Sequence, residues 1–155
     1  MTSCAEAVET RQDRPRQDVV PAVTEDAREI VAFLVRYEEV SLLPWQDESH
    51  LRTVLADPGT IAFVVRSDEG KLIGSLIGGV LGTRGTINQI AVDAARRGSG
   101  IGRSLVDAFE FALRRRGVRR YFLFATRANA ATRRFWTQQG FNEMTASEVT
   151  YERDL

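Results

Sequence analysis

The chain has 155 residues, of which 43% are hydrophobic and 27% charged, and its 21 basic and 21 acidic residues give a formal net charge of zero. This composition predicts one globular domain with its own core and argues against an intrinsically disordered protein. No apolar run approaches the roughly 20 residues of a membrane span, the single cysteine excludes an intramolecular disulfide, and with one histidine we expect no metal site.

The first 16 residues are polar and have no apolar periodicity. They lack both the basic start and the apolar run of a secretory signal peptide. We therefore expect a disordered leader over 1–16 and one domain over 17–155. We also expect a cytoplasmic location, which the single cysteine, Cys4, favours.

The N-terminal half of the domain is predicted to contain a strand, two helices and a β-hairpin. Thr24 followed by two acidic residues is typical of a helix N-cap, and Pro58-Gly59 marks the end of a second helix. Glycines within the second strand of the hairpin indicate a bulge or a close backbone approach. The expected elements are a strand over Asp18–Val23, a helix from Thr24 to about Val40, a helix over Asp47–Ala56, and strands over Thr60–Arg66 and Lys71–Leu81.

A strand, a glycine-rich loop and a helix follow in the middle of the chain. Ile87–Val92 is apolar enough for a strand, and from Gly100 to near Gly117 apolar residues recur with the period of a helix. Glycines at such a turn let the backbone approach a ligand, and free N–H groups of the first helical turn attract phosphate. With Arg97 and Arg103 adding charge, the stretch predicts a pyrophosphate cradle, although a turn that binds nothing is about as common.

Two familiar phosphate-binding motifs do not fit this stretch. A P-loop that began at Gly98 would need glycine at position 103, and so would the dinucleotide-binding fingerprint. Position 103 is Arg103, so the predicted cradle is of another kind.

The C-terminal part is predicted to contain a buried strand, a helix and two short strands. A strand that follows a crossover helix is expected to lie parallel to the strand before that helix, here Ile87–Val92. Asn129 is a suitable N-cap, and Gly140 a suitable end, for the helix between them. The expected elements are a strand over Tyr121–Ala125, a helix over Asn129–Gln139, and strands over Phe141–Thr145 and Glu148–Arg153.

Two motifs resemble signatures of the GNAT family of N-acetyltransferases. The stretch 97–102, Arg-Gly-Ser-Gly-Ile-Gly, is similar to the family's acyl-coenzyme A binding motif of Arg or Gln, two residues, Gly, one residue, and Gly or Ala. Asn129, Phe135-Trp136 and Gly140-Phe141 resemble its second signature. The resemblance covers roughly 19–141 and implies a single-domain α/β GNAT fold. Its mixed, mostly antiparallel, twisted central sheet would be flanked by about four helices.

The resemblance also implies acetyl-CoA as the cosubstrate, with no metal. In the family, the central strand separates from its neighbour and binds pantetheine through its backbone, while the glycine-rich cradle binds the diphosphate. The implied cofactor-binding residues are Ile90, Ala91, Val92, Arg97, Gly98, Ser99, Gly100, Ile101, Gly102, Arg103, Ser104, Asn129 and Trp136.

Two positions depart from the family pattern and leave the general acid and base unassigned. Trp136 replaces a tyrosine that protonates the leaving thiolate in many relatives, and indole is no usable acid, so we interpret Trp136 as packing beside the pantetheine arm. Asn88 and Gln89 stand where many relatives carry an acidic residue that acts on the amine. Candidates by region, each more often an exposed surface residue, are Glu38, Glu39, Asp47, Glu48, His50 and Tyr151.

The resemblance predicts an acetyl-CoA-dependent N-acetyltransferase that transfers acetyl directly to a primary amine in a ternary complex. The alternative is a catalytically silent acyl-CoA-binding or sensing module, which the missing tyrosine and glutamate favour. A free-thiol burst with a panel of amines would separate the two.

Charge distribution bears on the partners. Eleven arginines between positions 94 and 140 suit a polyanionic cofactor, and seven acidic residues between 38 and 69 suit a cationic acceptor, either a small molecule or a peptide. Few aromatic residues accompany the arginines, so nucleic-acid binding is the weaker interpretation, and we expect neither a nucleic-acid nor a membrane partner. Homodimers are common in the family.

Overall fold

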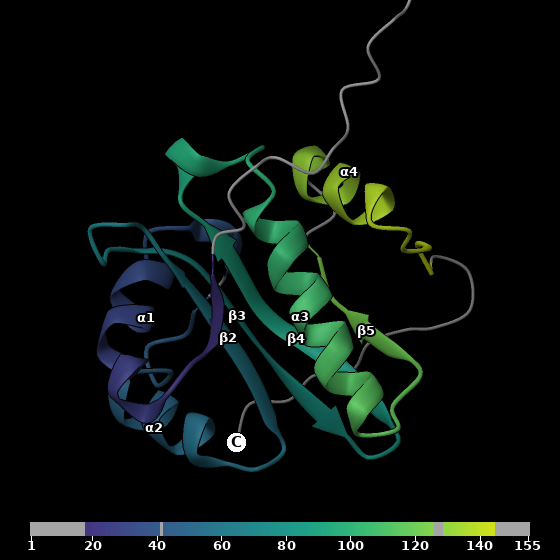
Figure 1. Ribbon diagram of the computed structural model, residues 1–155, viewed down its shortest axis with the longest axis horizontal. Coiled ribbons are helices and arrows are strands. Elements are labelled where there is room, and N and C mark those ends of the chain that lie inside the picture. The colour runs from purple at the N-terminus through teal and green to yellow at the C-terminus, as the bar shows by residue number, and fades with distance from the viewer. Residues whose placement is uncertain (1–17, 41, 126–128, 145–155) are drawn as a thin grey trace, which may run out of the picture.

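A five-stranded sheet with the strand order β1-β2-β3-β4-β5 runs through the molecule (Figure 1). The computed structural model describes residues 18–40, 42–125 and 129–144. Its strands are β1 (Val19–Pro21), β2 (Thr60–Arg66), β3 (Leu72–Leu81), β4 (Arg84–Val92) and β5 (Tyr121–Leu123). Its α-helices are α1 (Ala27–Leu34), α2 (Glu48–Ala56), α3 (Ile101–Arg115) and α4 (Ala130–Gln138), and its 3-10 turns are η1 (Thr24–Asp26), η2 (Glu38–Val40) and η3 (Ala94–Arg96).

The strand directions follow from the connections. Strands β1 to β4 pair antiparallel, whereas β5 is parallel to β4 because α3 carries the chain back across the sheet between them. The predicted mixed, mostly antiparallel sheet is therefore confirmed, and the part of the chain that the structure describes contains the expected four α-helices.

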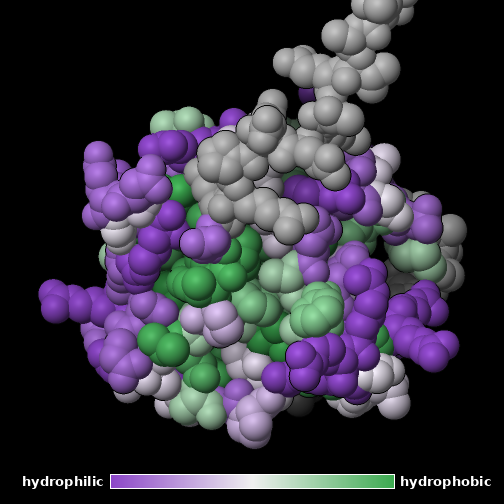
Figure 2. Space-filling view, viewed as in Figure 1, coloured by the Kyte–Doolittle hydropathy of each residue, from purple (hydrophilic) through white to green (hydrophobic). Residues whose placement is uncertain are grey.

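Helices cover both faces of the sheet, each over its own hydrophobic cluster. On one face α3 buries Leu105 and Phe109 against β2, β3 and β4. On the other face α1 buries Ile30 and Phe33, with α2 beside it. Figure 1 shows α3 lying across the sheet. In the same orientation, hydrophilic residues gather along the rim of the molecule and apolar residues nearer the middle (Figure 2).

Two glycines of β3 let α3 pack directly on the strand backbone. A Cβ atom on Gly74 would lie 2.7 Å from Cγ2 of Ile101, and one on Gly78 would lie 2.7 Å from the ring of Phe109. Any larger residue would push the helix off the sheet. The close backbone approach predicted from these glycines is confirmed.

The start of the first helix differs from the prediction. Thr24 does not cap the helix but begins η1, and the carboxylate of Asp26 accepts a hydrogen bond of 2.9 Å from the N–H of Val23. Helix α1 ends at Leu34, where an i to i+3 hydrogen bond from Tyr37 N–H tightens the last turn. The expected continuous helix to Val40 is therefore wrong, because η2 forms a separate turn.

The C-terminal predictions are corrected in part. Strand β5 ends at Leu123 rather than Ala125, and it is half-buried rather than buried, with Phe124 beyond it 75% exposed. Residues 141–144 form no strand. The predictions for 1–16 and for Glu148–Arg153 lie outside the described residues.

Tyr121 attaches β5 to α3. Its hydroxyl donates a hydrogen bond of 2.8 Å to Glu110, and its ring packs edge-on against Phe109 and Phe141. Burial, and then the hydrogen bond to the Glu110 carboxylate, raise the pKa of Tyr121 well above its ordinary value. The hydroxyl therefore stays protonated as a donor.

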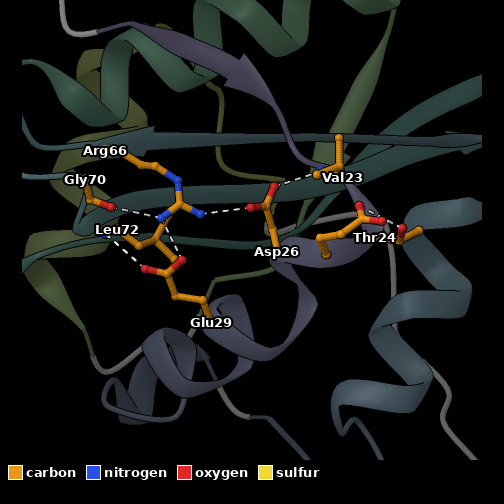
Figure 3. A network of polar contacts seen from close by, with 8 residues as sticks. Val23, Thr24, Asp26, Glu29, Arg66, Gly70 and Leu72 are labelled. Carbon is orange, nitrogen blue, oxygen red and sulfur yellow. Dashed lines mark hydrogen bonds and ion pairs between the residues drawn. The ribbon is translucent and has the colours of Figure 1, made fainter.

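Arg66 on β2 joins α1 to the β2–β3 hairpin (Figure 3). Its guanidinium donates to Glu29 at 2.6 Å, to Asp26 at 2.8 Å and to the carbonyl of Gly70 at 3.1 Å. The other oxygen of Glu29 accepts from the N–H of Leu72 at 3.3 Å. The hydrogen bond to Glu29 is the largest cause of a raised pKa at Arg66. The network fixes the end of the hairpin against the first helix.

We expect Arg66→Met to lower the free energy of unfolding by about 1–2 kcal/mol, because it leaves the mostly buried Asp26 carboxylate without its charged partner. Arg52→Met is the matched control, since the Arg52–Glu48 pair is exposed and should contribute less than about 0.5 kcal/mol. Urea unfolding measures both values. Equal losses in the two variants would contradict the structural role of the network.

Candidate active site

Strands β4 and β5 part halfway along β4. Only Gly85–Ile87 pairs with β5, and the pairing stops at Leu123. On the other side of β4 the register to β3 shifts, so that Ile87 lies opposite Gly78 and Gln89 opposite Ile77, with Asn88 as the extra residue. The edge of β4 beyond Ile87 therefore faces β5 without a strand partner there.

A cleft of about 370 Å³ opens where the strands part. Its walls come from η2, from β4, from the end of β5 and from α4. The lining residues are Glu39, Val40, Ile87, Asn88, Gln89, Ile90, Leu123, Phe124, Ala125, Asn129, Thr132 and Trp136. Among these described residues the side chains are apolar or neutral apart from one carboxylate, that of Glu39.

The turn that enters α3 presents an uncapped helix N-terminus. Gly98 and Gly100 have φ values of +78° and +94°, which L side chains rarely adopt. Gly100 precedes the first helical residue, no side chain caps this end, and the first turn holds no acidic residue. The first N–H groups of an α-helix have no partner within the helix, so this turn suits an anion.

Gly102 brings the turn against α4. A Cβ atom there would lie 3.1 Å from the ring of Phe135 and 3.7 Å from Val92 at the end of β4. Figure 1 shows α4 beyond the N-terminal end of α3. The uncapped turn, the end of β4 and α4 thus lie together.

Arg97 points from the loop toward η2. Its guanidinium pairs with Glu39 at 3.0 Å, its Nε donates to the carbonyl of Val92 at 3.4 Å, and it lies 5.4 Å from the ring centroid of Tyr37. Arg103 instead pairs with Asp107 on the exposed side of α3, at 3.6 Å. Of the two arginines expected at the cradle, Arg97 is the one that also reaches a residue lining the cleft.

The other residues predicted to bind the cofactor lie in different surroundings. Ile90 lines the cleft, whereas Ala91 is buried in the cluster under α1 and Val92 packs toward α3. Ser99 donates to the carbonyl of Arg96, and Ser104 is partly buried on the first turns of α3. A backbone role for the β4 residues and the turn stays a prediction.

Asn129 and Trp136 both line the cleft from α4. The Asn129 side chain accepts from the N–H of Thr132 at 3.0 Å, which confirms the predicted N-cap. Trp136 is 7% exposed and packs edge-on against Phe135 and Phe141. Their contact with a cofactor stays a prediction.

Three residues named as candidates on sequence grounds do not line the cleft, although the cavity beside His50 shares Asn88 and Gln89 with it. Asp47 caps α2 through the N–H of His50, and Glu48 pairs with Arg52 on the exposed side of α2. His50 packs against Trp45 and lines a second, smaller cavity of about 70 Å³ under α1 and α2. Tyr151 lies outside the described residues.

Sequence reasoning missed half of the residues that line the cleft. Those not singled out as site residues are Val40, Ile87, Leu123, Phe124, Ala125 and Thr132. Thr132 carried a usable signal, since it lies three residues after the asparagine cap, on the same side of the helix.

In the parts of the chain that the structure describes, no group of three or more His, Cys, Asp or Glu side chains could hold a metal ion. Within those parts, no helix is both long and apolar enough to cross a membrane.

Comparison with known proteins gives a family and a fold. The family model described as Acetyltransferase (GNAT) family matches residues 20–141. No curated protein sequence matches the chain.

Solved structures share the fold over most of the chain. The ribosomal-protein-alanine N-acetyltransferase of Brucella melitensis biovar Abortus 2308 has 24% identity over 87% of this chain and 99% of its own, with a TM-score of 0.70. The ribosomal-protein-S18-alanine N-acetyltransferase of Escherichia coli has 26% identity over 83% and 79%, with a TM-score of 0.69. AAC(6')-Iy in complex with the bisubstrate analogue CoA-S-monomethyl-acetylneamine has 18% identity over 88% and 98%, with a TM-score of 0.69.

We expect Gly100→Ala to lower the free energy of unfolding by about 1–2 kcal/mol, because alanine must adopt the left-handed backbone that glycine has there. Gly102→Ala should change it by less than about 1 kcal/mol, since helix propensity favours alanine and the Phe135 ring can move aside. Urea unfolding of both variants checks the difference. A larger loss at Gly102 than at Gly100 would contradict this account of the turn.

Proposed function

The chain belongs to the acetyltransferase (GNAT) family, and we propose that it transfers an acetyl group from acetyl-CoA directly to a primary amine within a ternary complex. The observation that carries the proposal is the arrangement around β4. Its open edge leads from the cleft to Val92, which lies beside the uncapped turn before α3. A long ligand with an anionic end and a polar, amide-containing arm fits these two features.

The residues present suit the diphosphate and pantetheine parts of acetyl-CoA. The free N–H groups of the first turn of α3 would hold the diphosphate, without a nearby carboxylate in that turn to oppose it. The unpaired edge of β4 around Ile90 would bind the amide groups of pantetheine through backbone hydrogen bonds, as a further strand would. Trp136 and Asn129 line the opposite wall.

Acetyl-CoA, when bound, supplies an activated thioester. The protein must hold the amine next to it, stabilise the oxyanion, and let the amine lose a proton. Orientation can contribute about 7–11 kcal/mol to catalysis. A positioned acid or base accelerates the reaction by about 100- to 10,000-fold, which corresponds to roughly 3–5 kcal/mol of activation free energy.

The acid and base of the family pattern are replaced in this chain. Asn88 and Gln89 line the cleft, and their amides cannot take a proton, although either can hold a water molecule. We assign to Trp136 the shape of the cleft wall rather than proton transfer, with solvent protonating the thiolate.

The acceptor is proposed only as a primary amine, on a small molecule or a peptide. The fold does not decide between such acceptors, because one fold carries many substrates. We also propose a cytoplasmic location and a homodimer.

Calorimetry should show that the wild type binds acetyl-CoA. When a panel of primary amines that includes benzylamine is added, the enzyme should release the free thiol of CoA in proportion to N-acetylated product.

Gly102→Val should weaken acetyl-CoA binding by at least about 10-fold, because its side chain displaces Phe135 and with it α4. Gly82→Ala, in the β3–β4 turn outside the cleft lining, is the control. Binding without thiol release for any amine would support a silent acyl-CoA module instead.

The Trp136 series tests the role of that ring. Trp136→Phe should keep most activity, and Trp136→Ala should lose cofactor affinity together with about 3 kcal/mol of stability, because a buried ring is removed. Trp136→Tyr restores a hydroxyl, and a higher kcat would indicate that the site accepts an acid there. Steady-state kinetics and urea unfolding measure the series. Complete loss of turnover in Trp136→Phe, with acetyl-CoA binding intact, would point to the indole N–H as a required donor.

A further inference from the structure

Glu39 is the carboxylate of the cleft lining, and Arg97, which does not line the cleft, pairs with it. Glu39 lies on η2, which contacts β4, and it lines the cleft with Asn88 and Gln89 of the β4 bulge. Its side chain is 35% exposed, so it lies at the edge of the cleft and stays in contact with solvent. No other residue that lines the cleft, within the described parts of the chain, carries a charge.

The carboxylate is held by one oxygen. Oε1 of Glu39 pairs with Arg97 at 3.0 Å, and the described residues give Oε2 no hydrogen bond. Arg97 is fixed in turn by the carbonyl of Val92 and by the ring of Tyr37. The geometry therefore leaves one carboxylate oxygen for a cationic ligand.

We propose, on the basis of the proposed function, that Glu39 receives the acceptor as an alkylammonium ion and takes its proton, with Arg97 as the positioning residue. The neutral amine then attacks the thioester carbonyl, the C–N bond forms and the C–S bond breaks. The second amine proton leaves to solvent, which protonates the thiolate, and Glu39 returns its proton to water. The amide oxygens of Asn88 and Gln89 can accept the remaining N–H groups.

This assignment specifies the substrate class. An alkyl ammonium has a pKa near 10.4 and is protonated at pH 7, so it needs both a counter-charge and a base. The free oxygen of Glu39 would accept hydrogen bonds from the ammonium group, while Arg97 holds the other oxygen. We infer that acetylation of a primary alkyl amine depends on Glu39, whereas acetylation of an aromatic amine, which arrives neutral, does not.

A competing role for the same residue is purely structural. Glu39 could orient Arg97 toward the diphosphate and never meet the amine. That role predicts that Glu39→Gln weakens acetyl-CoA binding and slows all amines alike. The two roles therefore differ in cofactor affinity and in the dependence of the loss on the amine.

The experiment compares Glu39→Gln, Glu39→Asp and the control Glu48→Gln, which removes a carboxylate from α2 outside the cleft lining. Benzylamine and aniline are the probes, because benzylamine is protonated at neutral pH and aniline is not, and each variant is compared with the wild type on the same amine. Acetyl-CoA affinity is measured by calorimetry, and kcat/KM by thiol release and product analysis.

We expect Glu39→Gln to lower kcat/KM for benzylamine by about 100-fold and for aniline by less than about threefold. Acetyl-CoA affinity should not fall, because in this assignment Glu39 meets the amine and not the cofactor. Glu39→Asp should recover part of the benzylamine activity, and Glu48→Gln should match the wild type.

Equal losses for both amines, or a weaker acetyl-CoA affinity in Glu39→Gln, would overturn the assignment in favour of the structural role. A Glu39→Gln protein that matches the wild type would overturn it as well, while leaving the proposed function standing. A wild type that binds no acetyl-CoA, or that acetylates no amine, would instead contradict the proposed function itself, and the inference would fall with it.

Discussion

The parting of β4 from β5 is the constraint on which the candidate site depends. A sheet normally satisfies its backbone N–H and C=O groups by pairing, and groups left without a partner are costly unless water or a ligand reaches them. Here the pairing stops after Ile87 and Leu123, and the bulge at Asn88 turns the strand at the same point. The cleft exists because β4 continues to Val92 while β5 ends. Every wall of the site is arranged around that unpaired edge.

Close packing of α3 on the sheet fixes the position of its N-terminal turn. Because Gly74 and Gly78 carry no side chain, the helix rests on the backbone of β3, and its N-terminal turn comes to the end of β4. Gly102 then allows Phe135 to approach, so α4 packs against the same turn. The uncapped turn before α3 and the cleft wall are thus positioned by small residues. A side chain at Gly74 or Gly78, or one larger than a methyl group at Gly102, would move the turn away from the cleft wall.

The local features of the fold and the site could be predicted from the sequence. The contacts between residues far apart in the chain could not. The period of apolar residues in α3, the glycines around it, and the cap at Asn129 act within a few residues, so the sequence alone indicated them. The pairing of Glu39 with Arg97 joins residues 58 positions apart, and it depends on where η2 settles after α1 ends early. The end of β5 at Leu123 is likewise a packing outcome, since its side chains are apolar enough for a longer strand.

The strand order repeats the order along the chain, and this bears on how the protein folds and opens. Strands β2, β3 and β4 form a meander of short connections, so they and α3 can assemble through nearby contacts. Strand β5 joins that unit by pairing with the first half of β4 and through Tyr121, and α4 joins it through Phe135 and Trp136. We expect the boundary between the two units to exchange amide hydrogens before the meander does, as a separate cooperative unit. Because the cleft follows that boundary, a ligand bound between β4 and α4 would contact both units and hold them together.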